Sequence, residues 1–299
     1  MVRADWIGVW WESVAAGLQE SLLRRVRWRA PQPFTTVKDI VYSRVQNRNL
    51  TLDLYLPKDA HSQTPILLAV HGGAWSMGSK AGVQWIGWLM ASRGWAVVCP
   101  NYRLAPKFKF PAPVDDLCRS VEWIHRSIGE WGMEPHYVCA FGISAGAHLA
   151  LLVGLKDRPS PFSKILAIFP PTDLTAPYYV EAARNPPPFM PNFLKDFLGC
   201  TYEEGPELWR QASPISYIHP KAPPCFLIQG TKDRLVPADQ AVRFAQALTK
   251  VGGQVHLRLV DGMGHGISLK PAVIRELRRV LLEALDFLQP QPSRSLIPS

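Results

Sequence analysis

The sequence predicts an α/β fold built on a mostly parallel, eight-stranded sheet that is flanked by helices. After residue 35, short apolar runs alternate with helical patterns, which is the order of strands and helices in a doubly wound sheet. Most of these runs are continuously apolar, as strands are when both faces of a parallel sheet are covered. The 299 residues are 47% hydrophobic and 19% charged, which indicates a globular protein with a substantial core.

Eight strands and five helices are predicted along the chain. Residues 37–43 and 50–56 alternate like antiparallel strands, and in the second run Asp53 and Tyr55 are assigned to the face opposite Leu52. The other predicted strands are residues 66–70, 96–99, 137–141, 165–169, 225–229 and 255–260. The predicted helices are residues 82–92, 114–128, 145–155, 238–251 and 271–288.

The predicted main domain covers residues 34–290, and two regions of the chain depart from this alternation. Residues 172–224 are rich in proline and aromatic side chains and are too long for a plain connection, so they predict a small lid insertion. Residues 1–33 carry apolar positions on one helical stripe and predict a cap helix over the site. A helix in a membrane interface, or one that binds a partner protein, are the alternatives. The Pro/Ser-rich residues 291–299 predict a flexible tail.

The charge balance does not indicate a nucleic-acid-binding protein. The net charge is +9, but basic residues gather near Arg24–Arg29 and Arg275–Arg279 without zinc-finger spacing or an aromatic RNA-binding motif. We interpret them as a solvated basic face with weak attraction to anionic surfaces, including membrane surfaces through residues 1–33.

The cysteine pattern favours a reduced, cytoplasmic protein. Five cysteines form no Cys-x-x-Cys pair, and Cys99, Cys139 and Cys225 lie inside apolar runs, where cysteine usually behaves as a small buried hydrophobe. Neither a secretory signal nor an apolar run of the roughly 20 residues needed for a membrane span is expected.

The most informative motif is Gly142-Ile-Ser144-Ala-Gly146, which joins a predicted strand to a predicted helix. This is the sequence form of a nucleophile elbow, a tight turn with the serine at its apex. Gly142 and Gly146 suit the turn because a Cβ two positions either side of the serine would find no room. Ser144 is therefore the candidate nucleophile.

A serine hydroxyl needs a base to take its proton, and the base needs an acid to fix its tautomer. Asp233 and His265 supply them, each in a loop after a predicted strand and in the chain order expected after such an elbow. Gly264 and Gly266 are expected to let the histidine loop reach the serine.

Each of these assignments has competitors in the sequence. Asp173 and Asp261 are rival acids, but the first follows the wrong strand and the second is better suited to cap its turn. His148 is interpreted as packed or hydrogen-bonded on the elbow helix. His71 is interpreted as a residue that orders the loop it begins.

The loop His71-Gly72-Gly73-Ala74-Trp75 follows the third predicted strand and supplies candidate oxyanion donors. Main-chain N–H groups of Gly72, Gly73 and Ala74, together with Ala145 after the nucleophile, would meet the charge that develops on a substrate carbonyl. A phosphate-binding loop is disfavoured because no Walker lysine follows.

Four aromatic residues are candidate walls of a substrate pocket, although they would equally serve to pack the lid onto the body: Trp75, Phe189, Phe193 and Trp209. Their apolar character favours acyl or aryl groups over sugars or polyanions. No metal site and no organic cofactor are predicted, since the histidines show no ligand spacing.

Taken together, these motifs resemble the α/β-hydrolase family, and within it the carboxylesterases of the hormone-sensitive-lipase and BD-FAE (feruloyl-esterase-like) type. The resemblance runs from residue 37 to residue 288 and also includes Asn101-Tyr-Arg-Leu-Ala-Pro106 and Phe110-Pro-Ala-Pro-Val-Asp-Asp116. Two positions depart from the hormone-sensitive-lipase pattern: Ala74 replaces a glycine, and Ile143 replaces an acidic residue.

This resemblance implies a serine carboxylesterase, monomeric or homodimeric, that cleaves small to medium acyl or aryl esters through an acyl-enzyme. The same motifs are also similar to arylformamidases, which hydrolyse N-formylkynurenine. A catalytically silent binding protein is the third alternative, disfavoured because Ser144, Asp233 and His265 are all present.

Overall fold

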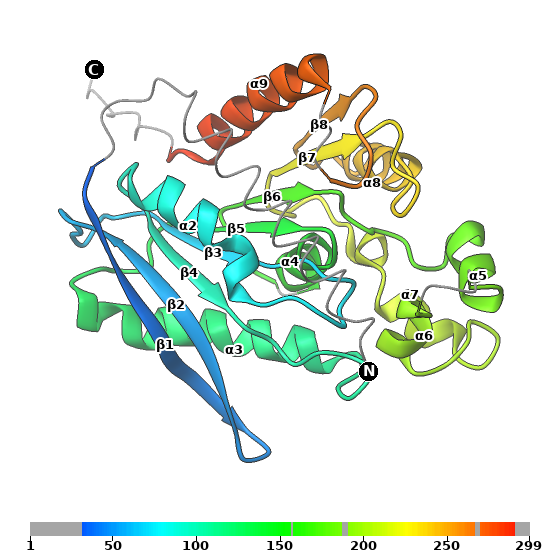
Figure 1. Cartoon of the computed structure of the whole chain (residues 1–299), viewed down its shortest axis with the longest axis horizontal. Helices are drawn as coiled ribbons and strands as arrows, with labels where there is room; N and C mark the ends of the chain where they lie inside the picture. The colour runs from blue at the N-terminus through cyan, green and yellow to red at the C-terminus, as the bar shows by residue number, and fades with distance from the viewer. Residues whose placement is uncertain (1–31, 157, 187–190, 267–269, 291–299) are drawn as a thin grey trace.

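A computed structural model describes residues 32–156, 158–186, 191–266 and 270–290. Its centre is one eight-stranded sheet with the order β1-β2-β4-β3-β5-β6-β7-β8. β1 pairs with β2, and β2 with β4, in antiparallel fashion, whereas all the other neighbours are parallel. The predicted mostly parallel, eight-stranded sheet is thereby confirmed (Figure 1).

Every predicted strand is present, with ends that differ from the prediction by at most three residues. The strands are β1 (Phe34–Val45), β2 (Arg48–Pro57), β3 (Ile66–Val70), β4 (Ala96–Pro100), β5 (Val138–Ile143), β6 (Lys164–Ile168), β7 (Cys225–Gly230) and β8 (Val255–Val260).

The five predicted helices are present as well: α2 (Gln84–Ala91), α3 (Ala112–Ser127), α4 (Ala145–Lys156), α8 (Asp239–Lys250) and α9 (Pro271–Leu288). Two short 3₁₀ helices that the sequence did not predict are η1 (Lys80–Val83) and η2 (Ile128–Trp131).

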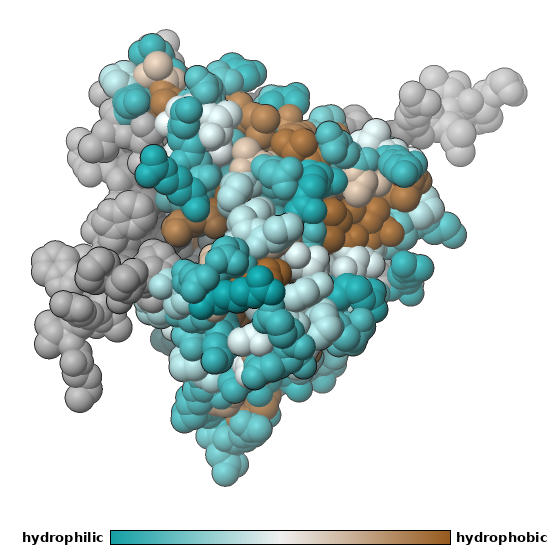
Figure 2. All heavy atoms as spheres, turned by 90° about the vertical axis from the view of Figure 1, so that its right-hand side faces the viewer, coloured by the Kyte–Doolittle hydropathy of each residue, from teal (hydrophilic) through white to brown (hydrophobic). Residues whose placement is uncertain are grey.

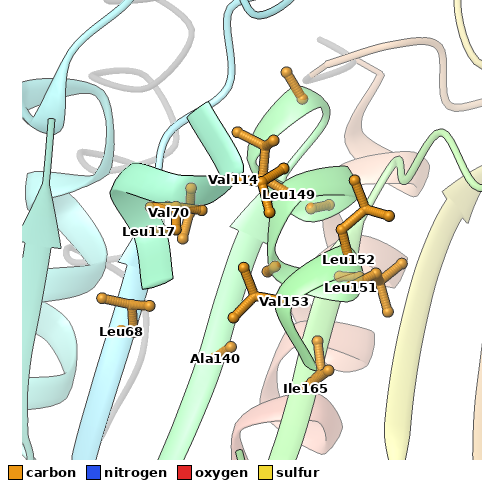
Figure 3. Packing of buried hydrophobic residues seen from close by; sticks show 14 of the residues in the cluster. Leu68, Val70, Val114, Leu117, Ala140, Leu149, Leu151, Leu152, Val153 and Ile165 are labelled. Carbon is orange, nitrogen blue, oxygen red and sulfur yellow. The ribbon is translucent and has the colours of Figure 1, made fainter. Parts of the chain in front are cut away.

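The five central strands β3 to β7 are buried on both faces of the sheet, which is why they read as continuous apolar runs. Along β3, Leu68 and Val70 contribute to one core layer, whereas Leu67 and Ala69 belong to the other. The first layer contains side chains of α3, α4 and α8, and Figure 3 shows α3 and α4 packed against the strands. The second layer contains side chains of α2 and α9.

Where the structure describes the predicted lid segment, it forms three short helices and one 3₁₀ turn: α5 (Pro177–Arg184), α6 (Phe193–Leu198), α7 (Pro206–Gln211) and η3 (Pro214–Tyr217). Proline stands at the start of α5 and α7, where its missing N–H has no partner to lose. Figure 1 shows α5, α6 and α7 grouped together at one end of the molecule. Whether they act as a lid stays a prediction.

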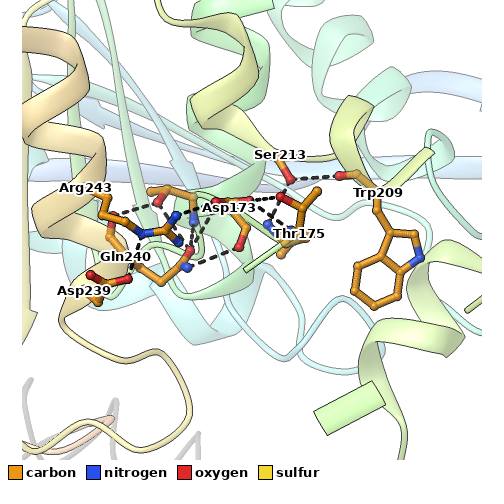
Figure 4. A network of polar contacts seen from close by, with 9 residues as sticks. Asp173, Thr175, Trp209, Ser213, Asp239, Gln240 and Arg243 are labelled. Atoms are coloured by element: carbon orange, nitrogen blue, oxygen red, sulfur yellow. Dashed lines mark hydrogen bonds and ion pairs between the residues drawn. The ribbon is translucent and has the colours of Figure 1, made fainter. Parts of the chain in front are cut away.

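A polar network fixes the first residues of this segment to α8 (Figure 4). Gln240 accepts hydrogen bonds of 2.7 Å at Oε1 from the backbone N–H groups of Thr172 and Asp173. Arg243 donates from Nη1 to Oδ2 of Asp173 at 2.7 Å. Asp173, a rival for the triad acid, is therefore engaged with α8.

Three cysteines behave as the sequence predicts, since Cys99, Cys139 and Cys225 are all fully buried. Burial raises the pKa of Cys139 and Cys225 to about 12.

In the described ranges, no helix is both long enough and apolar enough to cross a membrane. One face of the molecule is largely hydrophilic with separate hydrophobic patches (Figure 2). The predicted cap helix and the predicted tail lie outside the described residues.

Candidate active site

Ser144 stands between β5 and α4 in a tight turn with φ at 54°, a value that side-chain-bearing residues rarely adopt. A Cβ on Gly142 would lie 2.4 Å from the carbonyl oxygen of Gly146. One on Gly146 would lie 2.2 Å from the oxygen of Val70 and 2.4 Å from that of His71. Both glycines are therefore sterically required, and the predicted elbow geometry is confirmed.

The structure brings Ser144, His265 and Asp233 into one hydrogen-bonded chain. The Ser144 hydroxyl donates to Nε2 of His265 at 2.9 Å. Nδ1 of the same ring donates to Oδ2 of Asp233 at 2.7 Å. All three side chains are almost wholly buried, so water competes weakly with these contacts. Three residues separated by as many as 121 positions in the chain thus meet as the sequence predicted.

The glycine that lets the acid and histidine loops approach each other is not the one expected. A Cβ on Gly264 would meet only Lys232 O at 3.9 Å, an ordinary contact, so the expected steric need for Gly264 is wrong. At Gly230, the last residue of β7, a Cβ would lie 2.3 Å from the carbonyl oxygen of Met263. Gly266 has φ at 134°, which does favour glycine.

Asp233 receives a full set of donors. Its Oδ1 accepts 2.9 Å hydrogen bonds from the backbone N–H groups of Leu235 and Val236. Its Oδ2 accepts from His265 and from Nε2 of Gln229 at 3.0 Å. The sequence analysis did not single out Gln229, although a single polar residue inside the apolar run of β7 could have indicated a special role.

Asp261, the other rival acid, points elsewhere. Its Oδ1 accepts a 2.9 Å hydrogen bond from the hydroxyl of Thr231, whose Oγ1 in turn accepts from the N–H of Gly262. Asp261 thus ties the turn after β8 to the loop after β7, in accord with its predicted role in a turn.

The Gly-rich loop after β3 lies directly beside the nucleophile. A Cβ on Gly72 would stand 3.4 Å from that of Ser144. Gly73 has φ at 119°, and Ala74 and Trp75 also have positive φ values of 48° and 59°. Ala145 begins α4, so its N–H belongs to the first turn and has no acceptor within the helix. Of the four predicted oxyanion-hole residues, Gly72 and Ala145 therefore lie beside the serine, and Gly73 and Ala74 continue the same loop. Their role in binding an oxyanion stays a prediction.

Residues outside the loop hold it in this shape. The ring of His71 stacks on Tyr102 with centroids 4.2 Å apart, and the Tyr102 hydroxyl donates to His71 O at 3.0 Å. Nδ1 of His71 donates to Gly72 O at 2.7 Å. Burial lowers the pKa of His71 to about 4, so the ring is neutral near pH 7. His71 thus orders the loop, as predicted, and Tyr102 is a contributor that the sequence did not single out.

The buried Arg103–Asp116 pair explains two further motifs of the sequence. Arg103 donates from Nη2 to Oδ1 of Asp116 at 2.8 Å, and its backbone N–H donates to Oδ2 at 2.9 Å. Asp116 is fully buried in α3. The segment that carries Tyr102 is therefore fixed to α3, which supports the loop beside the serine.

His148 is packed and hydrogen-bonded on α4, as the sequence predicts. Nδ1 accepts from the indole N–H of Trp75 at 3.1 Å, and Nε2 donates to Ala212 O at 2.7 Å. Burial lowers its pKa to about 4, so a neutral ring with its proton on Nε2 fits both contacts.

The candidate pocket residues have different surroundings. Trp75 is buried and stacks on Phe197 with centroids 4.6 Å apart. Trp209 is fully buried, packs edge-on against Tyr202 within the lid segment and belongs to the same core layer as α3, α4 and α8. Phe193 is partly exposed at the start of α6, and Phe189 lies outside the described residues. Contact of any of them with a substrate stays a prediction.

A serine at strained backbone angles on a strand-to-helix turn, with acid and histidine on the loops after two later strands, defines an α/β-hydrolase. Among the described residues, no group of three His, Cys, Asp or Glu side chains is arranged to hold a metal ion. The site holds a hydroxyl, an imidazole and a carboxylate in one hydrogen-bonded chain.

Comparison with known proteins identifies the family. The BD-FAE family model matches residues 52–248. Esterase LipQ of Mycobacterium tuberculosis is 34% identical over 261 residues, which cover 84% of this chain and 61% of that protein. Isoprenylcysteine alpha-carbonyl methylesterase ICME of Arabidopsis thaliana is 28% identical over 240 residues, 76% of this chain and 56% of its own. The chain spans less than two thirds of the length of both relatives.

Solved structures share the fold. A bacterial heroin esterase superposes with a TM-score of 0.72 at 24% identity, covering 93% of this chain and 91% of that one. Esterase 2 of Thermogutta terrifontis gives a TM-score of 0.70 at 24% identity, covering 88% of this chain and 100% of that one. The chain belongs to the BD-FAE family of α/β-hydrolases.

Proposed function

We propose that this protein is a serine carboxylic ester hydrolase that works through an acyl-enzyme. One observation carries the proposal: the unbroken hydrogen-bonded chain from Ser144 through His265 to Asp233. The names of the relatives, which are esterases of several kinds, support the same reaction class.

In the proposed mechanism, Nε2 of His265 takes the proton of Ser144 as Oγ attacks the ester carbonyl carbon. Asp233 holds the ring with its proton on Nδ1 and stabilises the imidazolium that forms. The imidazolium then protonates the departing alkoxide. Water, deprotonated by the same nitrogen, attacks the acyl-enzyme and releases the acid and the free serine.

The negative charge of the tetrahedral intermediate needs donors that are already in place. We assign this role to the main chain of Gly72, Gly73 and Ala74, with the N–H of Ala145. Support comes from the close approach of Gly72 to Ser144 and from the positive φ values that turn the loop. Loss of one such donor typically costs about 10²–10³ in rate.

Esters with small to medium acyl or aryl groups are the proposed substrates. The aromatic side chains of Trp75, on the loop after β3, and of Phe193, at the start of α6, would offer apolar contact rather than charge. A structure of the Thermogutta esterase 2 is described as butyrate-bound, which fits an acyl group of this size.

The test is hydrolysis of p-nitrophenyl acetate, butyrate and octanoate by the wild type and by Ser144→Ala. We expect the wild type to cleave these esters and the variant to lose about 10⁶ in kcat. The profile over chain length reports the size of the acyl pocket. N-formylkynurenine is measured in parallel, and a higher kcat/KM for this formamide would replace the esterase proposal with arylformamidase activity.

Covalent labelling checks the nucleophile without a chromogenic ester. Paraoxon should add one diethylphosphoryl group per wild-type chain, located at Ser144 by peptide mass spectrometry, and none to Ser144→Ala. Folded wild-type protein that takes up no label and cleaves no ester would support the catalytically silent binding protein instead.

A further inference from the structure

The side chain of Gln229 lies behind the triad. It belongs to β7 and is fully buried. Its Nε2 donates to two acceptors, Oδ2 of Asp233 at 3.0 Å and the carbonyl oxygen of Val236 at 2.8 Å. Its Oε1 has no hydrogen-bond partner among the described residues. A buried amide oxygen without a partner lowers the free energy of unfolding, so other interactions of the Gln229 side chain must compensate for this loss.

The orientation of the amide follows from its neighbours. A rotation by 180° about the last bond would place Oε1 against a carboxylate and a carbonyl oxygen, neither of which carries a proton to donate. The amide group is therefore fixed with its donors toward Asp233. Gln229 and His265 are the two side chains that donate to this carboxylate in the described part of the chain, and both reach Oδ2.

We propose that Gln229 is a positioning residue for the proposed ester hydrolysis: it holds the carboxylate oxygen that orients His265 and limits the basicity of that histidine. The inference rests on the proposed function. A donor on Oδ2 withdraws negative charge from the atom that stabilises the imidazolium. Without it, the carboxylate would attract the imidazolium more strongly, and His265 would lose its proton only at higher pH.

An ionisable group near this carboxylate is Tyr179 of α5, which is electrostatically coupled to Asp233, Asp173 and Tyr178. Burial, with these neighbours, raises the pKa of Tyr179 well above its usual value. The phenol therefore stays neutral through the pH range in which a histidine titrates. On the α4 side, Nε2 of His265 contacts the hydroxyl of Ser144.

The test compares two variants of matched shape with a control. Gln229→Met keeps the length of the side chain and removes the donor, and Gln229→Glu places a second carboxyl beside Asp233. Gln240→Met is the control, because Gln240 is equally buried but bonds to Thr172 and Asp173 instead of the triad. Each variant is characterised by the pH profile of kcat/KM for p-nitrophenyl butyrate and by its melting temperature.

We expect Gln229→Met to move the acid limb of the profile to higher pH, so that kcat/KM at pH 6 falls about threefold relative to its plateau. We expect Gln229→Glu to be active only in the pH range in which the two carboxyls share one proton. Its profile of kcat/KM against pH should therefore be a narrower bell, with a decrease on the alkaline side. Gln240→Met should lower the melting temperature and leave the acid limb in place.

A second readout does not require turnover. The proton on Nδ1 of His265 gives a downfield NMR resonance, which we expect to shift in Gln229→Met and Gln229→Glu, also on a Ser144→Ala background, but not in Gln240→Met. An unshifted resonance with a wild-type pH profile would overturn the inference. If the wild type hydrolyses no ester but the resonance still shifts when Gln229 is replaced, only the proposed function would be contradicted.

Discussion

The indole N–H of Trp75 donates to Nδ1 of His148 across 3.1 Å, and the opposite ring nitrogen of His148 donates to Ala212 O at 2.7 Å. One buried imidazole thus joins three segments: the loop beside the nucleophile, helix α4 and the residue after α7. Both contacts need a neutral ring with its proton on Nε2, and burial supplies that state because it lowers the pKa to about 4.

We predict that His148→Leu lowers kcat by about 10- to 100-fold, because a displacement of about 1 Å in the loop can misalign the reacting groups by enough to cost about 100-fold in rate. The indole N–H and the carbonyl oxygen left unpaired should each cost about 1–3 kcal/mol of the free energy of unfolding. His148→Gln can restore one donor and one acceptor and should recover part of both losses. Kinetics with p-nitrophenyl butyrate and urea unfolding measure the two effects; an unchanged kcat in His148→Leu would show that the loop is set by other contacts.

The closest approach at the elbow gives a second prediction. Gly146→Ala would place a methyl group 2.2 Å from Val70 O and 2.4 Å from His71 O, both of them backbone atoms. We expect a loss of stability of about 3 kcal/mol or more and a loss of activity, since β3 and the loop that follows must move. Gly129→Ala is the control: a Cβ there meets nothing within 4 Å, so its effect should stay within about 1 kcal/mol. Equal melting temperatures for the two variants would contradict this steric argument.

The sequence was sufficient to place the triad because of how parallel sheets are built. The carboxyl ends of adjacent parallel strands meet at one edge, so polar residues that follow β5, β7 and β8 had to lie near one another. Ser144, Asp233 and His265 each follow such a strand, and continuous apolar runs marked the strands themselves.

What the sequence did not reveal depends on partners far along the chain. Asp53 was assigned to the face of β2 opposite Leu52, but its partner on that buried face is Lys80, 27 positions later, which forms an ion pair with it. Likewise, the need for glycine at position 230 comes from Met263, on the loop after β8. The lid helices have six to eight residues, too few for an apolar period to stand out among prolines.

The two buried histidines beside the nucleophile predict how stability depends on pH. His71 and His148 both have a pKa of about 4 in the folded protein, lowered by burial from a usual value of 6.5. Between these values the unfolded chain binds more protons than the folded one, so the free energy of unfolding rises with pH. Stability should therefore fall as the pH drops below about 6.5 and continue to fall until about pH 4, by about 3 kcal/mol for each histidine.

Urea unfolding between pH 7.5 and pH 4.5 measures this dependence. His148→Gln should be less stable at pH 7.5 than the wild type but lose less stability on acidification, because one of the two buried imidazoles is gone. His125→Gln is the control, since His125 is exposed on α3 and its replacement should leave the curve unchanged. The prediction would be wrong if the wild type and His148→Gln lost the same free energy of unfolding over this range. His148 would then contribute nothing to the pH dependence, and its imidazole would have to take up a proton while it stays buried between Trp75 and Ala212.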